Sequence, residues 1–123
     1  TPFTGHTGAV TAVTVTDLDG HPAVVSGSND RSVRVWDLAT GAPIGTPFTG
    51  HTSWVRAVTV TDLDGRPIIV SAGGHRLIIA SWPGSREADC DLVIELSSPI
   101  NALAMTGQVI ACATDLGIVL IEL

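Results

Sequence analysis

Short runs of alternating apolar and small polar residues, separated by turn clusters, dominate the first third of the chain. Residues 10–15, with the sequence VTAVTV, have the period of two that is typical of a β-strand. Turn-forming groups such as Ser28-Asn29-Asp30 interrupt the pattern, and signals for helices are nearly absent. Four strands are predicted here, at residues 10–15, 23–26, 32–36 and 44–48. Pro43 and Pro47 place the last of them at a sheet edge, so the predicted unit is a four-stranded antiparallel meander.

The same unit returns further along the chain. The hexapeptide TPFTGH occupies residues 1–6 and again residues 46–51, and the string AVTVTDLDG occupies residues 12–20 and 57–65. Both pairs are 45 residues apart, which indicates a tandem array of stacked supersecondary units.

Later units depart from the first. In the second unit His75 aligns with Asp30, and Ser81 aligns with Trp36. A third unit is visible only as a pattern, with predicted strands at residues 100–105, 109–114 and 118–123. The detailed motif therefore covers about the first third of the chain.

Three elements of the first unit carry a resemblance to a known family. Gly5-His6 opens the unit, residues 26–30 (SGSND) form its middle turn, and residues 33–37 (VRVWD) close it. The chain thereby resembles the WD-repeat β-propellers, in a bacterial tandem-repeat form. The resemblance implies an all-β fold of four-stranded antiparallel blades, three per chain. We expect one segment over residues 1–123, with blade cores at about 10–49, 55–96 and 100–123 and an outer strand at residues 1–4.

Three blades are too few to close a ring, since propellers have typically four to eight. Each open end would expose several large aliphatic side chains, which costs on the order of 10 kcal/mol at about 1.5 to 3 kcal/mol each. We expect these end faces to be buried in a homodimer, in which two chains complete a six-bladed ring. A ring completed by sequence beyond this chain and a nine-bladed ring of three chains are the alternatives.

Charge and composition exclude several classes of partner and cofactor. The formal net charge is −6, and all six basic residues are Arg, which argues against a nucleic-acid partner. No apolar run is long enough to span a bilayer and no signal peptide is visible, so we expect no membrane partner and a cytoplasmic location. Exclusive use of Arg hints at a bacterial source. Cys90 and Cys112 lack metal-binding spacing, Asp17 and Asp19 are too few carboxylates for calcium, and no cofactor is expected.

A set of polar residues in the first two units requires an explanation, because His, Ser and Asp are also the residue types of a hydrolase triad. The resemblance instead implies a structural network, in which His bridges a strand hydroxyl and a turn Asp while Trp adds its indole N–H. The residues assigned to this network are His6, Ser26, Asp30, Trp36, His51 and Ser71. We expect His6→Ala to cost about 1 to 3 kcal/mol of stability.

The loops at one end of a propeller, its top face, are where the family usually binds partners. They lie between outer and inner strands and between second and third strands. In this chain they carry the candidates Trp54, Arg56, Asn29, Arg31, His75 and Arg76. Trp and Arg are enriched at binding hot spots, and the first unit has Ala9 in the place of Trp54. The alternative is that Trp54 packs on a neighbouring loop.

These observations favour a non-enzymatic protein–protein interaction or scaffold module of a bacterial regulatory protein. The sequence offers no activated nucleophile, metal cluster or glycine-rich phosphate loop. The alternative function is a self-assembling part-propeller that forms a closed homo-oligomeric ring with a structural role.

Overall fold

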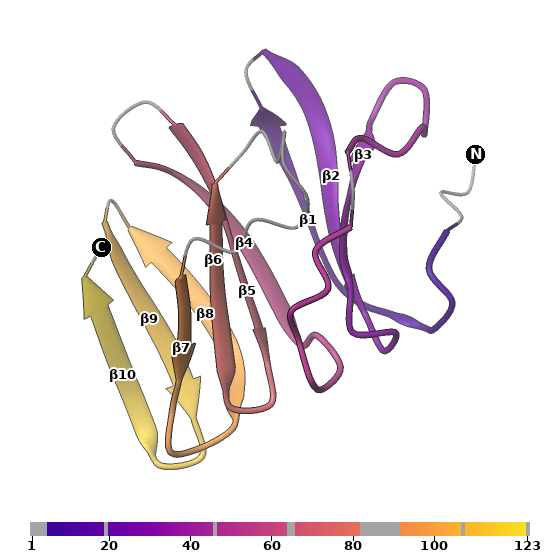
Figure 1. Cartoon of the computed structure of the whole chain (residues 1–123). Coiled ribbons are helices and arrows are strands. Elements are labelled where there is room, and N and C mark those ends of the chain that lie inside the picture. Colours follow the sequence, from indigo (N-terminus) through magenta and orange to yellow (C-terminus); the bar gives the residue numbers. More distant parts are fainter. Residues whose placement is uncertain are drawn as a thin grey trace.

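Three antiparallel sheets make up the computed structural model, which describes residues 5–18, 20–45, 47–63, 66–81, 92–106 and 108–122 (Figure 1). The first sheet contains β1 (Val10–Leu18), β2 (His21–Ser28) and β3 (Val33–Asp37). The second contains β4 (Ala57–Leu63), β5 (Arg66–Gly73), β6 (Arg76–Ser81) and β7 (Leu92–Glu95). The third contains β8 (Ile100–Thr106), β9 (Val109–Thr114) and β10 (Gly117–Glu122).

Within each sheet the strands follow chain order, so each strand pairs with the strand next to it in the sequence. The prediction of an all-β protein with antiparallel sheets is confirmed. No helix occurs among the residues that the structure describes, and hence none there that is long and apolar enough to cross a membrane.

A regular fourth strand is missing from the described part of the first sheet. The predicted strand at residues 44–48 runs antiparallel to β3, but only as isolated bridges, Val33 with Phe48 and Trp36 with Pro43. Val33 and Phe48 exchange both backbone hydrogen bonds, at 2.9 Å each. The Ile44 N–H also donates to the Val35 carbonyl at 2.8 Å, so the ladder breaks between Ile44 and Phe48, where the edge segment advances four residues while β3 advances two. The predicted strand at residues 1–4 lies outside the described residues.

The sheets stack face to face, with β1, β4 and β8 as neighbouring strands of successive sheets (Figure 1). One apolar core lies between the first and second sheets and includes Val25, Val35 and Ile69. A second lies between the second and third sheets and includes Val70, Leu77 and Ile110. Alternating residues of β5 therefore face opposite cores, which explains its nearly continuous apolar sequence.

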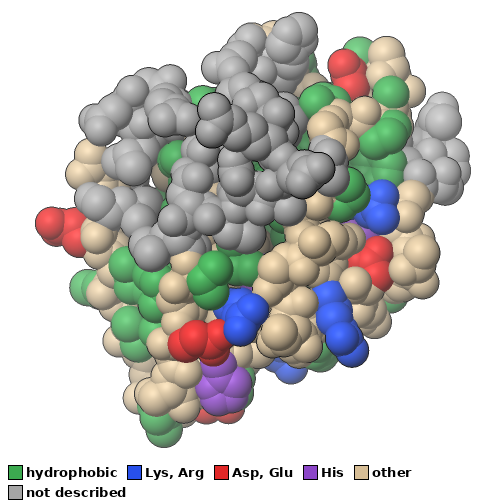
Figure 2. All heavy atoms as spheres, viewed as in Figure 1, with side chains coloured by type: hydrophobic (Ala, Val, Ile, Leu, Met, Phe, Trp, Pro, Cys, Tyr) green, Lys and Arg blue, Asp and Glu red, His purple; other side chains and the backbone are tan. Residues whose placement is uncertain are grey.

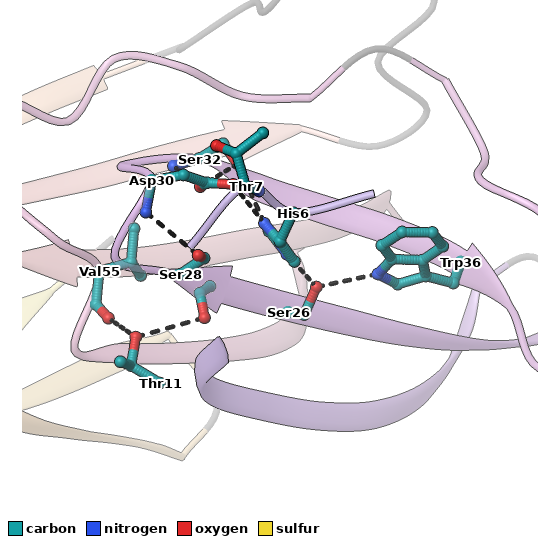
Figure 3. Close-up of polar contacts among 10 residues, drawn as sticks. His6, Thr7, Thr11, Ser26, Ser28, Asp30, Ser32, Trp36 and Val55 are labelled. Carbon is teal, nitrogen blue, oxygen red and sulfur yellow. Dashed lines mark hydrogen bonds and ion pairs between the residues drawn. The ribbon is translucent and has the colours of Figure 1, made fainter. Parts of the chain in front are cut away.

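Each junction between sheets has an apolar residue that inserts against the preceding sheet. Val55, just before β4, packs against Gly27, where a Cβ would lie 2.4 Å from the Val55 Cγ1 atom. Its N–H donates to the Ser28 carbonyl at 3.0 Å, and the Thr11 hydroxyl donates to the Val55 carbonyl (Figure 3). Ile100, at the start of β8, takes the corresponding place between the second and third sheets. It is fully buried, and its N–H donates to the Gly74 carbonyl at 2.8 Å. We call Val55 and Ile100 the insertion residues.

Candidate functional site

Four side chains of the first unit, from β2, β3, their turn and the segment before β1, form one hydrogen-bonded network (Figure 3). The His6 Nδ1 atom lies 2.9 Å from Asp30 Oδ2, and Nε2 lies 2.7 Å from Ser26 Oγ. The Trp36 indole N–H donates to the same Ser26 oxygen at 2.9 Å. Because a carboxylate only accepts, Nδ1 carries the proton toward Asp30, and the Ser26 hydroxyl can then donate to Nε2. The sequence placed these residues in one network, and the structure brings them together.

Asp30 is held by the β2–β3 turn as well as by His6. Its carboxylate accepts the Ser32 hydroxyl at 2.6 Å, the Ser32 N–H at 2.9 Å and the Thr7 N–H at 3.0 Å. Burial acts to raise the pKa of this carboxyl, but the hydrogen bonds from Ser32, His6 and Thr7 outweigh it and hold the pKa well below its usual range. Arg31 follows with φ of 71°, a left-handed conformation that completes the turn.

The geometry favours structure over catalysis. Ser26 is buried in the middle of β2, and its oxygen is engaged by both His6 and Trp36. A nucleophilic hydroxyl must reach a substrate, and this one faces the interior of its own network. The arrangement therefore ties the segment around His6 to β2, β3 and their turn.

Among the described residues, the second sheet contains only the His–Ser half of this network. The His51 Nε2 atom lies 2.8 Å from Ser71 Oγ, and both residues are buried. The His51 Nδ1 atom is buried as well, and in the described part of the chain it has no hydrogen-bond partner. Such an atom has lost its hydration without replacement, which is unfavourable.

A shorter turn explains the loss. Five residues separate the opposed pair Gly27 and Val33 in the first sheet, whereas four separate Ala72 and Leu77 in the second. The register therefore places Ala80 opposite Ile69, where the first sheet has Trp36 opposite Val24. The predicted alignment of Ser81 with Trp36 is wrong by one residue, because the shortened turn shifts β6.

The residue that faces the unpartnered His51 nitrogen is Gly73. A Cβ on Gly73 would lie 3.1 Å from His51 Nδ1 and only 2.6 Å from the Trp54 carbonyl oxygen, so no side chain fits there. His75, which the sequence aligned with Asp30, is exposed instead, and its Nδ1 atom lies 3.2 Å from the Leu96 carbonyl. Neither residue can therefore act as the missing acceptor.

Burial dominates the electrostatics of His51. Removal of the ring from water, with a smaller contribution from the positive charge of Arg76, lowers the pKa of His51 from 6.5 to about 4. The imidazole is consequently neutral at physiological pH. Its environment is that of a buried structural residue, not of a proton-transfer group that works near neutrality.

The candidates for partner binding divide into two groups on the top face, which lies toward the lower edge of Figures 1 and 2. Asn29, Arg31 and Trp54 line one hollow of about 410 Å³, together with Thr52 and Ser53. The sequence did not single out Thr52 and Ser53, although they precede Trp54 directly. Figure 2 shows several Arg side chains at this end of the molecule.

Trp54 does not pack into the interior, because 41% of its surface is exposed. The Arg56 guanidinium lies over its ring, 4.8 Å from the ring centroid, which is a cation–π geometry. Arg56 also donates to Asn101 Oδ1 at 3.3 Å. The pair therefore presents an aromatic surface and a positive charge side by side.

Arg76 and His75 belong to the second group and are engaged within the fold. Arg76 donates to Glu95 Oε1 at 2.7 Å and to the Gly50 carbonyl at 2.8 Å, and His75 contacts the Leu96 backbone. These contacts connect β6 to β7 and to the segment before His51. The structure thus separates them from the hollow beside Trp54.

One comparison with known proteins bears on this arrangement. Residues 1–37 match the family model described as WD domain, G-beta repeat. Among curated proteins none matches the chain. The resemblance carried by Gly5-His6, the SGSND turn and the VRVWD strand is therefore confirmed for the first unit. Repeats of this kind generally mediate protein–protein interactions and are typically non-enzymatic.

Proposed function

Because its first unit is a WD repeat, we propose that this chain is a non-enzymatic interaction module that binds a protein partner through its top face. The observation that carries the proposal is the exposed Trp54 ring, paired with Arg56 beside the hollow of Asn29 and Arg31. We further propose that the module belongs to a bacterial cytoplasmic regulatory protein; the exclusive use of Arg among its basic residues supports the bacterial source.

The fold does not require Trp54, since the first unit has Ala9 at the equivalent place. An exposed Trp with an adjacent Arg has the chemistry of a binding hot spot, in which a large ring is desolvated on contact. Arg31 and Arg56 give the surface a local positive charge although the chain is acidic overall. The matching partner is an acidic segment with an aromatic or aliphatic residue that packs on the Trp54 ring.

A peptide library selected on the chain tests this assignment. We expect acidic peptides with an aromatic or aliphatic anchor, and we expect Trp54→Ala to weaken their binding at least tenfold in calorimetric titrations. The matched control is Leu38→Ala, because Leu38 has a similar exposure of 43% but lies after β3, away from the hollow. Selected peptides that bind both variants equally well would refute a site at Trp54.

Self-assembly is the second candidate function, and a separate observation favours it. Large apolar residues are exposed on β1 of the first sheet and on β10 of the third, namely Val10, Val13, Val15, Ile118 and Leu120. We propose that two chains bury these faces against each other and complete a six-bladed ring. Light scattering on a sizing column should then give twice the 12.7 kDa of one chain, and a monomeric mass would contradict the ring.

A further inference from the structure

We propose that two copies of the chain dock head to tail, with Val10 of one copy as an insertion residue against Ala113 of the partner subunit. This inference rests on the proposed self-assembly and adds the contact and the direction of docking. It would make the junction between copies equivalent to the two junctions within the chain.

The internal junctions define what such a contact requires. Each has an insertion residue on one side and a small residue on the other, Val55 against Gly27 and Ile100 in one core with Ala72. Each also has a backbone hydrogen bond from the insertion residue to the turn of the preceding sheet. Each junction thus combines an inserted apolar side chain with a small residue that receives it, and the backbone hydrogen bond fixes their relative position.

The first sheet supplies an unused insertion residue. Val10 precedes Val55 by the 45-residue repeat and is 54% exposed, whereas Val55 is fully buried. The same holds further along β1, where Val13 and Val15 are exposed while their repeat equivalents Val58 and Val60 pack against the first core. The outer face of β1 is therefore built like the covered face of β4.

The third sheet supplies an unused receiving position. Gly27 pairs with Ala12, Ala72 with Ala57, and Ala113 with Ala102. Ala113 therefore occupies the place of Gly27 and Ala72 in the third sheet. Ala72 shows that an alanine there leaves room for an insertion residue, since both it and Ile100 are fully buried.

A shallow apolar hollow surrounds this position on the outer face of the third sheet. Its volume is about 160 Å³ and it is lined only by apolar residues, Ala102, Leu103, Ala104, Ala111, Ala113 and Ile118. Four of these are alanines, so the hollow has room for the valine side chains of β1. No charged lining residue opposes their burial.

A second copy is the occupant that these features specify. One chain carries the inserting half of the junction at one end and the receiving half at the other, and both halves are exposed. Two such chains form two identical head-to-tail contacts, and a heterologous contact of this kind closes into a ring when the rotation allows. Six sheets fall within the range of known propellers.

Disulfide trapping tests the contact directly. In a Cys90→Ser background, Val10→Cys and Ala113→Cys are made as separate chains, while the native Cys112 lies buried in the second core. At the internal junction a Cβ on Gly27 would lie 2.9 Å from the Val55 Cβ, and a small separation to accommodate Ala113 brings the pair into the 3.5 to 4.5 Å range of disulfides. Under mild oxidation we expect a cross-linked dimer from the mixture and from neither variant alone.

Each other outcome has a definite meaning. Cross-linking of Val10→Cys with itself, or of Ala113→Cys with itself, would overturn the head-to-tail arrangement. A dimeric mass by light scattering without a cross-link in the mixture would overturn this contact and leave self-assembly standing. A monomeric mass of the native chain would overturn both.

A second variant tests the same contact without thiol chemistry. Ala113→Trp fills the receiving position. Because this position lies on an exposed surface, the fold should persist, while the dissociation constant of the dimer should rise at least tenfold. Leu38→Trp is the control, since it adds the same ring outside the contact and should leave the mass unchanged. An Ala113→Trp chain that stays as dimeric as the control would contradict the contact.

Discussion

The buried His51 makes the stability of the chain sensitive to mild acid. In the folded state the pKa of His51 is lowered to about 4 from an ordinary value of 6.5. The full difference corresponds to about 3 kcal/mol, at 1.36 kcal/mol per pH unit. Its physical origin is that protonation would create a charge on a ring that is buried and lies near the positive charge of Arg76.

The direction of the effect follows from proton binding. Between pH 4 and pH 6.5 the unfolded chain binds a proton at His51 that the folded chain does not, so the free energy of unfolding falls as the pH falls. At pH 5 the expected loss relative to neutral pH is about 2 kcal/mol. Asp30 contributes little in this window, because its lowered pKa affects stability only at pH values near and below the ordinary range of carboxylates.

Urea unfolding at pH 7, 6 and 5, at one chain concentration, measures the loss. His51→Gln should remove most of the pH dependence, whereas His75→Ala should keep it because His75 is exposed. Proton NMR of the imidazole provides an independent readout of the pKa. A His51 that titrates near 6.5, or equal pH slopes in the native chain and His51→Gln, would refute this reasoning.

Three further changes probe the fold and the site. Gly73→Ala should cost about 1 to 3 kcal/mol in urea unfolding, because its Cβ would meet the backbone oxygen of Trp54, which no rotamer change can move. Trp54→Ala should lower the free energy of unfolding by no more than about 1 kcal/mol, since 41% of the residue surface is exposed; a larger loss would show that Trp54 is a packing residue. Asp30→Ala should cost about 2 to 3 kcal/mol by circular dichroism melts, because Ser32, Thr7 and His6 lose their acceptor.

Much of the strand pattern was predictable from the sequence, because one sheet face is apolar and turn residues mark the ends. Residues 100–105 and 109–114 were expected as strands and form β8 and β9. The irregular edge at residues 44–48 was harder to foresee in detail. Two prolines signalled an edge, but whether the remaining N–H groups form a ladder depends on the backbone path.

The site was less predictable where it depends on register. A fixed 45-residue offset aligned Ser81 with Trp36, but a deletion of one residue in the β5–β6 turn moves Ala80 into that place. Since side chains alternate faces along a strand, a shift by one residue changes which core each of them meets. The hollow beside Trp54 also depends on loops of two units meeting, which no single unit encodes.

The hydrogen bonds of His6 and those of His51 should contribute different amounts to the free energy of unfolding. Matched double variants can measure the two contributions. His6→Leu with Ser26→Ala removes the donor to Asp30 and the acceptor of the Trp36 indole N–H, so we expect a loss of about 2 to 4 kcal/mol.

His51→Leu with Ser71→Ala removes both members of an isolated pair together with the unpartnered Nδ1 atom, and apolar groups then fill a place between two packed sheets. Replacement of both partners by apolar groups of similar size is close to neutral, so we expect a change within about 1 kcal/mol. Within one chain, apolar cores cover both faces of the second sheet, which can therefore lack the Asp and Trp partners among its described residues. Only one face of the first sheet adjoins such a core, so its other face relies on the hydrogen bonds of the network. Equal losses in the two double variants, measured by urea unfolding at pH 7, would contradict this account.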